Sequence, residues 1–296
     1  MSTDWADKIA ERLAGGGLPQ TGVCLILGGV DTGKTTLAAA LTGWLASSGP
    51  VGVIDADVGQ SHIGPPATVG WAIVDRPDVF VGATPCGCPG QARGPAPTIP
   101  GGISFVGDVT PVGHLLQLTA AIAQCLRQVS KVAEHIIIDT PGFIAGPAAS
   151  VLWWTVQRIV QPELIVAVQR ENELNDILAG LQNLGSQIER LKAPPQIQAK
   201  SPQARRSYRQ DQFRRYFADS CLYNLKLSDL TIQATRNPGS GTLVALRDSQ
   251  GVDRAVGIIE RWQQDRDAVT VRAPGLDVSQ IRCLVVGDVT VDLVNG

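Results

Sequence analysis

The sequence has little charge, few neighbouring cysteines and no long apolar run. Charged residues make up 18 % of the 296 residues and the formal net charge is −2, so the total predicts no polyanionic partner such as duplex DNA. Only Cys86 and Cys88 lie close together among six cysteines, and a chain of this length needs no disulfide scaffold. We therefore interpret the cysteines as reduced thiols, and this single pair as a weak indication of a metal site.

Membrane signals are missing as well. The first residues do not combine a basic segment with an apolar one, as a signal peptide would. The most apolar stretch, residues 151–168, is interrupted by polar residues and a proline, which are Gln157, Arg158, Gln161, Pro162 and Glu163. We therefore expect a cytoplasmic protein without a membrane partner.

The apolar residues that are present predict an α/β fold. Hydrophobic residues make up 44 % of the chain, and its length suits about two domains. Short apolar runs at 23–27, 51–57, 135–142 and 164–169 predict buried strands, and helical patterns separate them. The expected sheet is therefore mostly parallel and flanked by helices.

Three further segments complete the expected organisation. Residues 3–14 repeat apolar side chains at every fourth position, which predicts a docking helix. Residues 83–103 are so rich in Gly and Pro that we expect neither helix nor strand there. After residue 223, short apolar runs alternate with turn signals, which predicts a small antiparallel β domain. The expected division is an N-terminal helix at 1–20, a main domain at 21–222 and the β domain at 223–296.

A glycine-rich loop follows the first predicted strand and precedes a predicted helix at 36–46. Its sequence, GGVDTGKT, matches the phosphate-binding pattern G-x-x-x-x-G-K-[ST] in full. Backbone N–H groups and the helix N-terminus would surround phosphate oxygens, Lys34 would reach the outer phosphates and Thr35 would bind Mg²⁺. The sequence therefore predicts a P-loop NTPase-type fold with a nucleoside triphosphate site. The residues expected to contact the nucleotide are Gly28, Gly29, Val30, Asp31, Thr32, Gly33, Lys34, Thr35 and Thr36.

Two carboxylates end the second predicted strand. Asp55 and Asp57 stand at the carboxyl edge, where open α/β sheets build their active sites. One of them can hold Mg²⁺, and the other can accept a proton from an attacking hydroxyl, which Gln60 could orient. A pair of acids that is merely solvated is the alternative.

Another strand end leaves a second alternative open. Asp139-Thr140-Pro141-Gly142 is also what a switch-type GTPase would show. Such a protein would read guanine with an Asn-Lys-x-Asp motif after a later strand, yet the sequence after 164–169 is RENELNDI. The GTPase hypothesis therefore lacks its base-recognition element.

The segment 200–215 is strongly basic in an otherwise neutral chain. It holds six basic residues against one acid, Asp211; they are Lys200, Arg205, Arg206, Arg209, Arg214 and Arg215. Arg205 and Arg209 fall on adjacent helical turns, so their guanidinium groups can converge on phosphates. A solvated arginine-rich helix is the alternative, although P-loop kinases carry an arginine lid at this place.

Together these motifs resemble the polynucleotide 5′-hydroxyl kinase family, over about residues 21–293. GGVDTGKTT resembles that family's P-loop, DADVGQ its Asp-x-x-Gln motif and FVGDVTP its Gly-x-x-Thr/Ser-Pro segment. DTPGF is similar to its Thr-x-Gly-aromatic clasp, and ARRSYRQDQFRRYF to its arginine lid. YNLKLSDL is similar to the stretch that leads into its C-terminal domain.

The resemblance implies a role for each matching residue. Lys34, Asp57 as the base, Gln60, Arg209 and Arg214 would be catalytic. Thr35 and Asp55 are the assigned Mg²⁺ ligands. The expected contacts with the acceptor strand are Thr110, Thr140, Gly142, Phe143 and Arg205.

Two features depart from that family. Phe143 stands where a Trp is more usual, which keeps stacking chemistry on a smaller ring. Eukaryotic members carry an N-terminal β domain, and about 20 residues precede the first predicted strand here, so we expect a short form without that domain.

The leading hypothesis is an Mg²⁺-dependent kinase that moves the γ-phosphate of ATP, or GTP, to the 5′-hydroxyl of single-stranded or end-exposed RNA or DNA. A non-catalytic ATP-binding adaptor in a processing assembly is one alternative. A GTPase-type switch or a small-molecule kinase is the other. The choice between RNA and DNA, the donor base, the oligomeric state and protein partners stay open.

Overall fold

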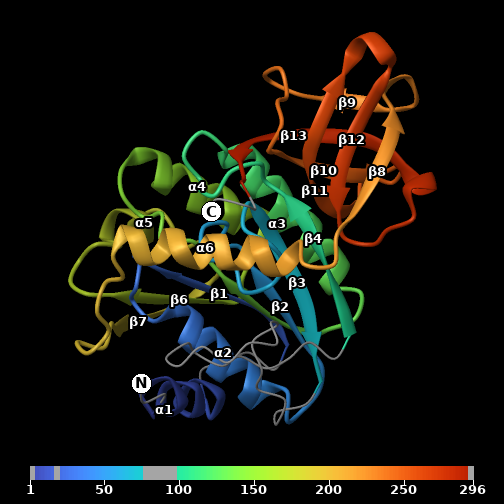
Figure 1. Ribbon diagram of the computed structural model, residues 1–296. Helices are drawn as coiled ribbons and strands as arrows, with labels where there is room; N and C mark the ends of the chain where they lie inside the picture. Colours follow the sequence, from blue (N-terminus) through green and yellow to red (C-terminus); the bar gives the residue numbers. More distant parts are fainter. Residues whose placement is uncertain (1–3, 17–20, 76–98, 293–296) are drawn as a thin grey trace. The chain divides into compact units, whose positions relative to one another are not determined.

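The computed structural model describes residues 4–16, 21–75 and 99–292 (Figure 1). The chain forms two compact units, each built from separate stretches of sequence. The first unit comprises Met1–Asp57, Gly70–Gly101 and Ile122–Lys200. The second comprises Val58–Val69, Gly102–Ala121 and Ser201–Gly296. These units combine separate stretches of the chain, and the division into 1–20, 21–222 and 223–296 stays a prediction.

The first unit contains a mostly parallel sheet, which confirms the predicted fold class. Its strands are β1 (Gly22–Gly28), β2 (Val51–Asp55), β3 (Thr68–Val74, which begins in the second unit), β5 (His135–Asp139), β6 (Leu164–Gln169) and β7 (Gln187–Lys192). They lie in the order β7-β6-β1-β5-β2-β3. Every neighbouring pair is parallel except β2 and β3, which are antiparallel. All four predicted apolar strands are present.

Helices cover this sheet and explain its apolar runs. They are α1 (Asp4–Ala14), α2 (Lys34–Leu45), α4 (Pro147–Val160), α5 (Asn175–Ala179) and the second half of α3 (Leu115–Val129). Leu13 of α1 and Leu41 of α2 share one buried cluster with Cys24 and Ile26 of β1. Leu25, on the opposite face of β1, is also fully buried. Because both faces of the strands are covered, continuous apolar sequences replace alternating ones.

The docking helix predicted near the N-terminus is confirmed. Trp5 and Ile9 are partly buried against the same cluster that holds Leu13. None of the helices within the described ranges is both long and apolar enough to cross a bilayer.

One prediction about the Gly/Pro-rich segment is wrong. β4 (Ile99–Phe105) is a strand, although the sequence predicts none before residue 104. A Cβ atom at Gly101 would collide with the carbonyl group of Trp71, so a glycine allows the two backbones to approach closely there. The rest of the segment, with Cys86 and Cys88, lies outside the described residues.

The second unit holds the predicted C-terminal β structure. Its strands are the end of β4 with β8 (Cys221–Lys226), β9 (Thr231–Gln233), β10 (Thr242–Asp248), β11 (Asp253–Gln263), β12 (Ala268–Ala273) and β13 (Ile281–Thr290). β4, β11, β10, β13 and β9 follow one another, while β12 pairs with both β11 and β8. All of these pairs are antiparallel except β13 with β9. Short 3₁₀ turns lie at Leu227–Asp229, Gln264–Arg266 and Val278–Gln280.

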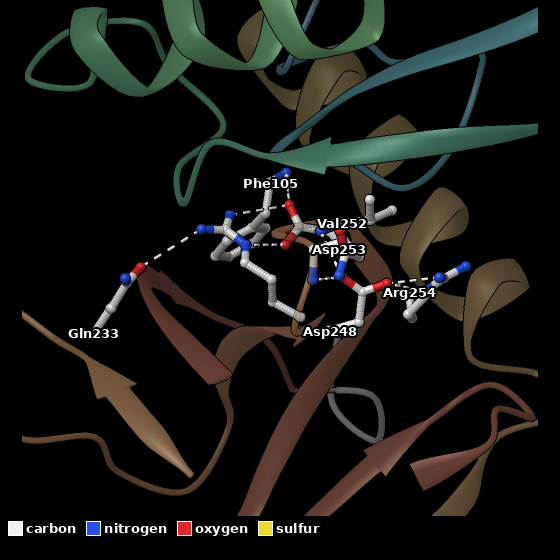
Figure 2. A network of polar contacts seen from close by, with 8 residues as sticks. Phe105, Gln233, Asp248, Val252, Asp253 and Arg254 are labelled. Carbon is white, nitrogen blue, oxygen red and sulfur yellow. Dashed lines mark hydrogen bonds and ion pairs between the residues drawn. The ribbon is translucent and has the colours of Figure 1, made fainter. Parts of the chain in front are cut away.

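A polar network ties the end of β4 to this β structure (Figure 2). The Phe105 N–H donates to Asp253 Oδ2 at 2.7 Å, and Arg247 Nε donates to Asp253 Oδ1 at 2.7 Å. Asp288 continues the attachment, because its backbone N–H donates to Gly107 O at 2.8 Å. The segment that carries Thr110 is thereby fixed at its start within the second unit.

Helix α6 (Pro202–Tyr216) belongs to the second unit and is the predicted basic helix. Ser201 caps it by accepting a 3.1 Å hydrogen bond from the Ala204 N–H, and Pro202 opens the first turn. Phe213 is buried with Phe105 and residues of the β structure. Phe213 therefore anchors the helix. Arg206 and Arg214 are exposed, whereas the partly buried arginines are Arg205, Arg209 and Arg215.

Candidate active site

The loop between β1 and α2 has the backbone of an anion site. Gly33 caps α2 with φ 98°, and Asp31 has φ 54°. Left-handed residues of this kind turn successive N–H groups inward, which makes a concave binding surface for anions. Thr32 Oγ1 stabilises the turn by donating to Gly29 O at 3.0 Å. The helix N-terminus adds positive potential at the same place.

Lys34 is held inside this loop. Its side chain is buried, and Nζ donates to Gly29 O at 2.7 Å. Burial lowers the pKa of Lys34, and the charges of Asp139, Asp57, Asp31 and Glu173 act against that change. Acids around Lys34 therefore oppose, in part, the effect of its burial.

Asp139 is paired with another acid, Asp55, on the neighbouring parallel strand. Asp55 and Asp139 are paired in register at the ends of β2 and β5, and both are buried. Burial, followed by the charge of Asp55, raises the pKa of Asp139 to about 7. The Ala56 N–H donates to Asp139 O at 2.8 Å, and the Asp57 N–H donates to Asp55 Oδ1 at 3.0 Å. Asp57 itself is half-buried, so its carboxylate can meet a substrate.

The geometry of Asp139 fits a divalent cation. Thr35 Oγ1 donates to Asp139 Oδ2 at 2.6 Å, whereas Asp139 Oδ1 is buried without a hydrogen-bond partner. A hydroxyl and carboxylate oxygens are hard ligands of the kind that Mg²⁺ takes in small number beside phosphates and water. Within the described ranges, no group of three or more His, Cys, Asp or Glu side chains is arranged to hold a metal ion.

Asp139 is a functional candidate that the sequence-based metal assignment missed. That assignment named Thr35 and Asp55. The signal was an acid at the end of a buried strand, but its contact with Thr35 depends on the pairing of β1 with β5.

The residues after Asp139 line the same loop. A Cβ atom at Gly142 would lie 2.6 Å from the Val30 N atom, so only glycine allows this approach to the phosphate-binding loop. Thr140 is fully buried and its Oγ1 donates to Ile26 O at 2.6 Å. Phe143 is half-buried, and its carbonyl accepts from Trp153 Nε1 at 2.7 Å. The contacts of these residues with an acceptor strand stay a prediction.

Comparisons with known proteins agree with this geometry. Residues 28–219 match the family described as the mRNA cleavage and polyadenylation factor CLP1 P-loop. The chain belongs to the CLP1 P-loop family. Membership in a P-loop family implies a nucleotide ligand, and its binding by the loop from Gly28 to Thr35 stays a prediction.

Archaeal proteins are among the relatives of this CLP1 P-loop chain. It is 30 % identical over 227 residues to polyribonucleotide 5′-hydroxyl-kinase PH0197 of Pyrococcus horikoshii, covering 76 % of this chain and 57 % of the relative. It is 29 % identical over 213 residues to polyribonucleotide 5′-hydroxyl-kinase MJ1315 of Methanocaldococcus jannaschii, covering 72 % and 55 %. The chain thus spans little more than half the length of these relatives.

A solved structure shares the fold. The Clp1p–Pcf11p complex matches with a TM-score of 0.69 at 14 % identity, over 97 % of this chain and 78 % of that one. At this identity the match bears on the fold, which it confirms.

Arg170 also contacts the loop between β1 and α2, and nothing in the sequence indicated this contact. Arg170 follows β6 and donates to Val30 O at 3.2 Å and to Asp31 O at 2.7 Å. Its backbone N–H donates to a carboxylate oxygen of Glu173 at 3.2 Å. In the sequence, the segment that begins with Arg170 stands out only because it lacks the guanine-reading Asn-Lys-x-Asp motif. Arg170 therefore satisfies the carbonyl groups of two consecutive loop residues.

The remaining predicted residues belong to the second unit. They are Gln60, Thr110, Arg205, Arg209 and Arg214. Thr110 lies in a turn where its N–H donates to Asp108 Oδ1 at 3.1 Å. Arg214 NH1 donates to Asp211 Oδ1 at 3.1 Å in an exposed pair. The structure therefore brings the nucleotide and acid residues together in the first unit, and gathers the predicted lid and Gln60 in the second.

Proposed function

We propose that this chain is a polynucleotide 5′-hydroxyl kinase that uses ATP, or GTP, and Mg²⁺. The observation that carries the proposal is the group of Lys34, Thr35 and Asp139, with the half-buried Asp57 close enough for its charge to act on Lys34. Polyribonucleotide 5′-hydroxyl-kinases among the relatives support it. Phosphate binding and a proton acceptor are the two requirements of a phosphoryl transfer to a hydroxyl.

In this proposal the nucleotide binds through the loop Gly28–Thr36. Backbone N–H groups surround the phosphates, and Lys34 Nζ keeps protons for them because an ammonium group has three donors and only one is given to Gly29 O. Thr35 and Asp139, with Asp55 behind them, would hold Mg²⁺. The ion would neutralise charge on the phosphates when bound. Asp139 must be ionised for that role.

The transfer itself forms one bond and breaks another. The acceptor's 5′-oxygen attacks the γ-phosphorus, and Asp57 takes the hydroxyl proton. The bond from the γ-phosphorus to the bridging oxygen breaks, so that a nucleoside diphosphate leaves and a 5′-phosphate end remains. Gln60 orients the hydroxyl, and Arg209 and Arg214 offset the transferred charge. The proposed acceptor contacts are Thr110, Thr140, Gly142, Phe143 and Arg205.

The test is transfer of labelled γ-phosphate to RNA and DNA oligonucleotides of one sequence that carry a 5′-hydroxyl, with and without Mg²⁺. Lys34→Ala is the blank and Lys131→Ala, at an exposed lysine, is its matched control. We expect label on 5′ ends with the wild type and the control, and none with the blank. Oligonucleotides that already carry a 5′-phosphate should stay unlabelled.

The adaptor hypothesis makes a different prediction for the same experiment. A protein that keeps ATP as a structural element would bind ATP in a filter assay but label neither oligonucleotide. That outcome would replace the kinase proposal. GTP hydrolysis without transfer would favour a GTPase-type switch.

A further inference from the structure

The loop that carries Gln60 is held by helix α6, inside the second unit. Tyr208 Oη donates to Ser61 O at 3.0 Å, and Gln212 Nε2 donates to the same oxygen at 3.0 Å. Gln212 Nε2 also donates a hydrogen bond to Tyr208 Oη, at 2.8 Å. The carbonyl of Ser61, the residue after Gln60, therefore accepts two hydrogen bonds from one face of the helix.

The loop is itself stiff, so this attachment can fix the position of Gln60. Ser61 is fully buried, and its Oγ donates to Ile63 O at 2.9 Å. The Ala67 N–H closes the loop on Val58 O at 2.9 Å. Ala67 then packs in the same buried cluster as Phe213 of α6. Helix and loop share both polar contacts and a core.

The same contacts fix the direction of the arginines. Tyr208 and Gln212 are four residues apart and form one stripe of α6. Arg205 and Arg209 are also four apart, one position further round the helix. A rotation of α6 that moved the arginines would therefore break the hydrogen bonds to Ser61.

We propose that Tyr208 and Gln212 are positioning residues, which lock Gln60 and the arginines of α6 into one body. This inference rests on the proposed kinase function. In it, the group that orients the hydroxyl and the groups that offset transferred charge keep a fixed spacing, because both are attached to Ser61. Gln60 and the arginines are then already in place before each acceptor binds, and no rearrangement is needed for the chemical step.

The variant that tests this is Tyr208→Phe, which keeps the ring and removes the hydroxyl. Tyr223→Phe is the matched control, since the hydroxyl of Tyr223 also contacts backbone, at the Leu276 N–H, away from α6. If the free energy of one hydrogen bond is lost from the transition state, the rate falls by about two- to tenfold. We expect Tyr208→Phe to lower kcat by about that factor, with the KM for ATP unchanged and the melting temperature close to that of the control.

A double variant separates positioning from general damage. If Tyr208 acts partly through Gln60, then Tyr208→Phe lowers kcat by a smaller factor in the Gln60→Ala background than in the wild type. Equal losses in both backgrounds, or a wild-type kcat in Tyr208→Phe, would overturn the inference while leaving the kinase function intact.

Hydrogen exchange gives a readout that does not need activity. Amides of residues 58–69 should exchange faster in Tyr208→Phe than in Tyr223→Phe. Unchanged protection would overturn the inference even if the wild type labelled no oligonucleotide, which is the separate result that would overturn the proposed function.

Discussion

Thr35 Oγ1 donates a 2.6 Å hydrogen bond to Asp139 Oδ2, across 104 positions of sequence. The contact joins the phosphate-binding loop to the end of β5 and leaves the other carboxylate oxygen of Asp139 buried without a partner. An ionised carboxylate with an unused buried oxygen is costly unless a cation or a proton joins it. The proposed Mg²⁺ site would therefore link cation binding to the stability of the protein at this residue.

The first prediction concerns pH in the absence of Mg²⁺ and nucleotide. The pKa of Asp139 is raised to about 7 in the folded protein, mainly by burial and then by Asp55, and an unfolded Asp has a pKa of about 3.9. Between these values the folded protein keeps a proton that the unfolded chain releases. Protonated Asp139 therefore contributes most to the free energy of unfolding at low pH, and this contribution is lost as pH rises towards 7.

Asp139→Asn removes this titration while keeping the shape of the side chain. We expect the variant to gain in free energy of unfolding relative to the wild type as pH rises from 5 to 8, measured by urea denaturation. A difference between the two proteins that stayed constant with pH would contradict the raised pKa.

The second prediction assigns the base. Asp57→Asn should bind ATP as the wild type does, because the phosphate contacts come from the loop and Lys34. Loss of the proton acceptor should lower the transfer rate by roughly 10²- to 10⁴-fold. Single-turnover labelling of a 5′-hydroxyl oligonucleotide, with ATP binding measured in parallel, checks both points. A variant with normal transfer would remove Asp57 from this role.

The third prediction concerns the approach of Gly142 to Val30. A Cβ atom at Gly142 would lie 2.5 Å from Val30 Cγ2, so Gly142→Ala must push the phosphate-binding loop away. We expect a loss of about 1–3 kcal/mol in the free energy of unfolding, together with weaker ATP binding. Gly49→Ala is the control, since nothing lies within 4 Å of its added carbon. If the two variants had the same free energy of unfolding and the same ATP affinity, then the loop could accommodate the added Cβ atom without moving.

Local patterns predicted the strands and the loop, but not the pairs that long-range register creates. The apolar run of β1 and the motif GGVDTGKT predict β1, the turn and α2 from local sequence, because both faces of β1 are buried and glycine allows the left-handed backbone at Gly33. The contact of Asp139 with Thr35 could not be predicted, because it follows from the pairing of β5 with β1. β4 was missed because glycine, which disfavours an isolated strand, here permits close contact with Trp71.

The last prediction concerns the network around Asp253, in the second unit (Figure 2). Its side chain is fully buried and accepts hydrogen bonds from both the Phe105 N–H and Arg247, whose side chain is 23 % exposed. Asp253→Ala would leave a buried donor and a largely buried cation without their partner. Breaking such a pair costs about 3–5 kcal/mol, whereas an exposed pair contributes at most about 1 kcal/mol.

Asp211→Ala is the matched control, because Asp211 pairs with Arg214 on the surface, where both side chains are about half exposed. Urea denaturation should therefore separate the two aspartates clearly, with Asp253→Ala much less stable and Asp211→Ala near the wild type. Asp253→Asn adds a finer test, since its amide oxygen can still accept from Phe105 while the charge that faces Arg247 is gone. If Asp253→Ala and Asp211→Ala lost equal stability, then the network would not hold the end of β4, and the placement of the Thr110 segment would need another cause.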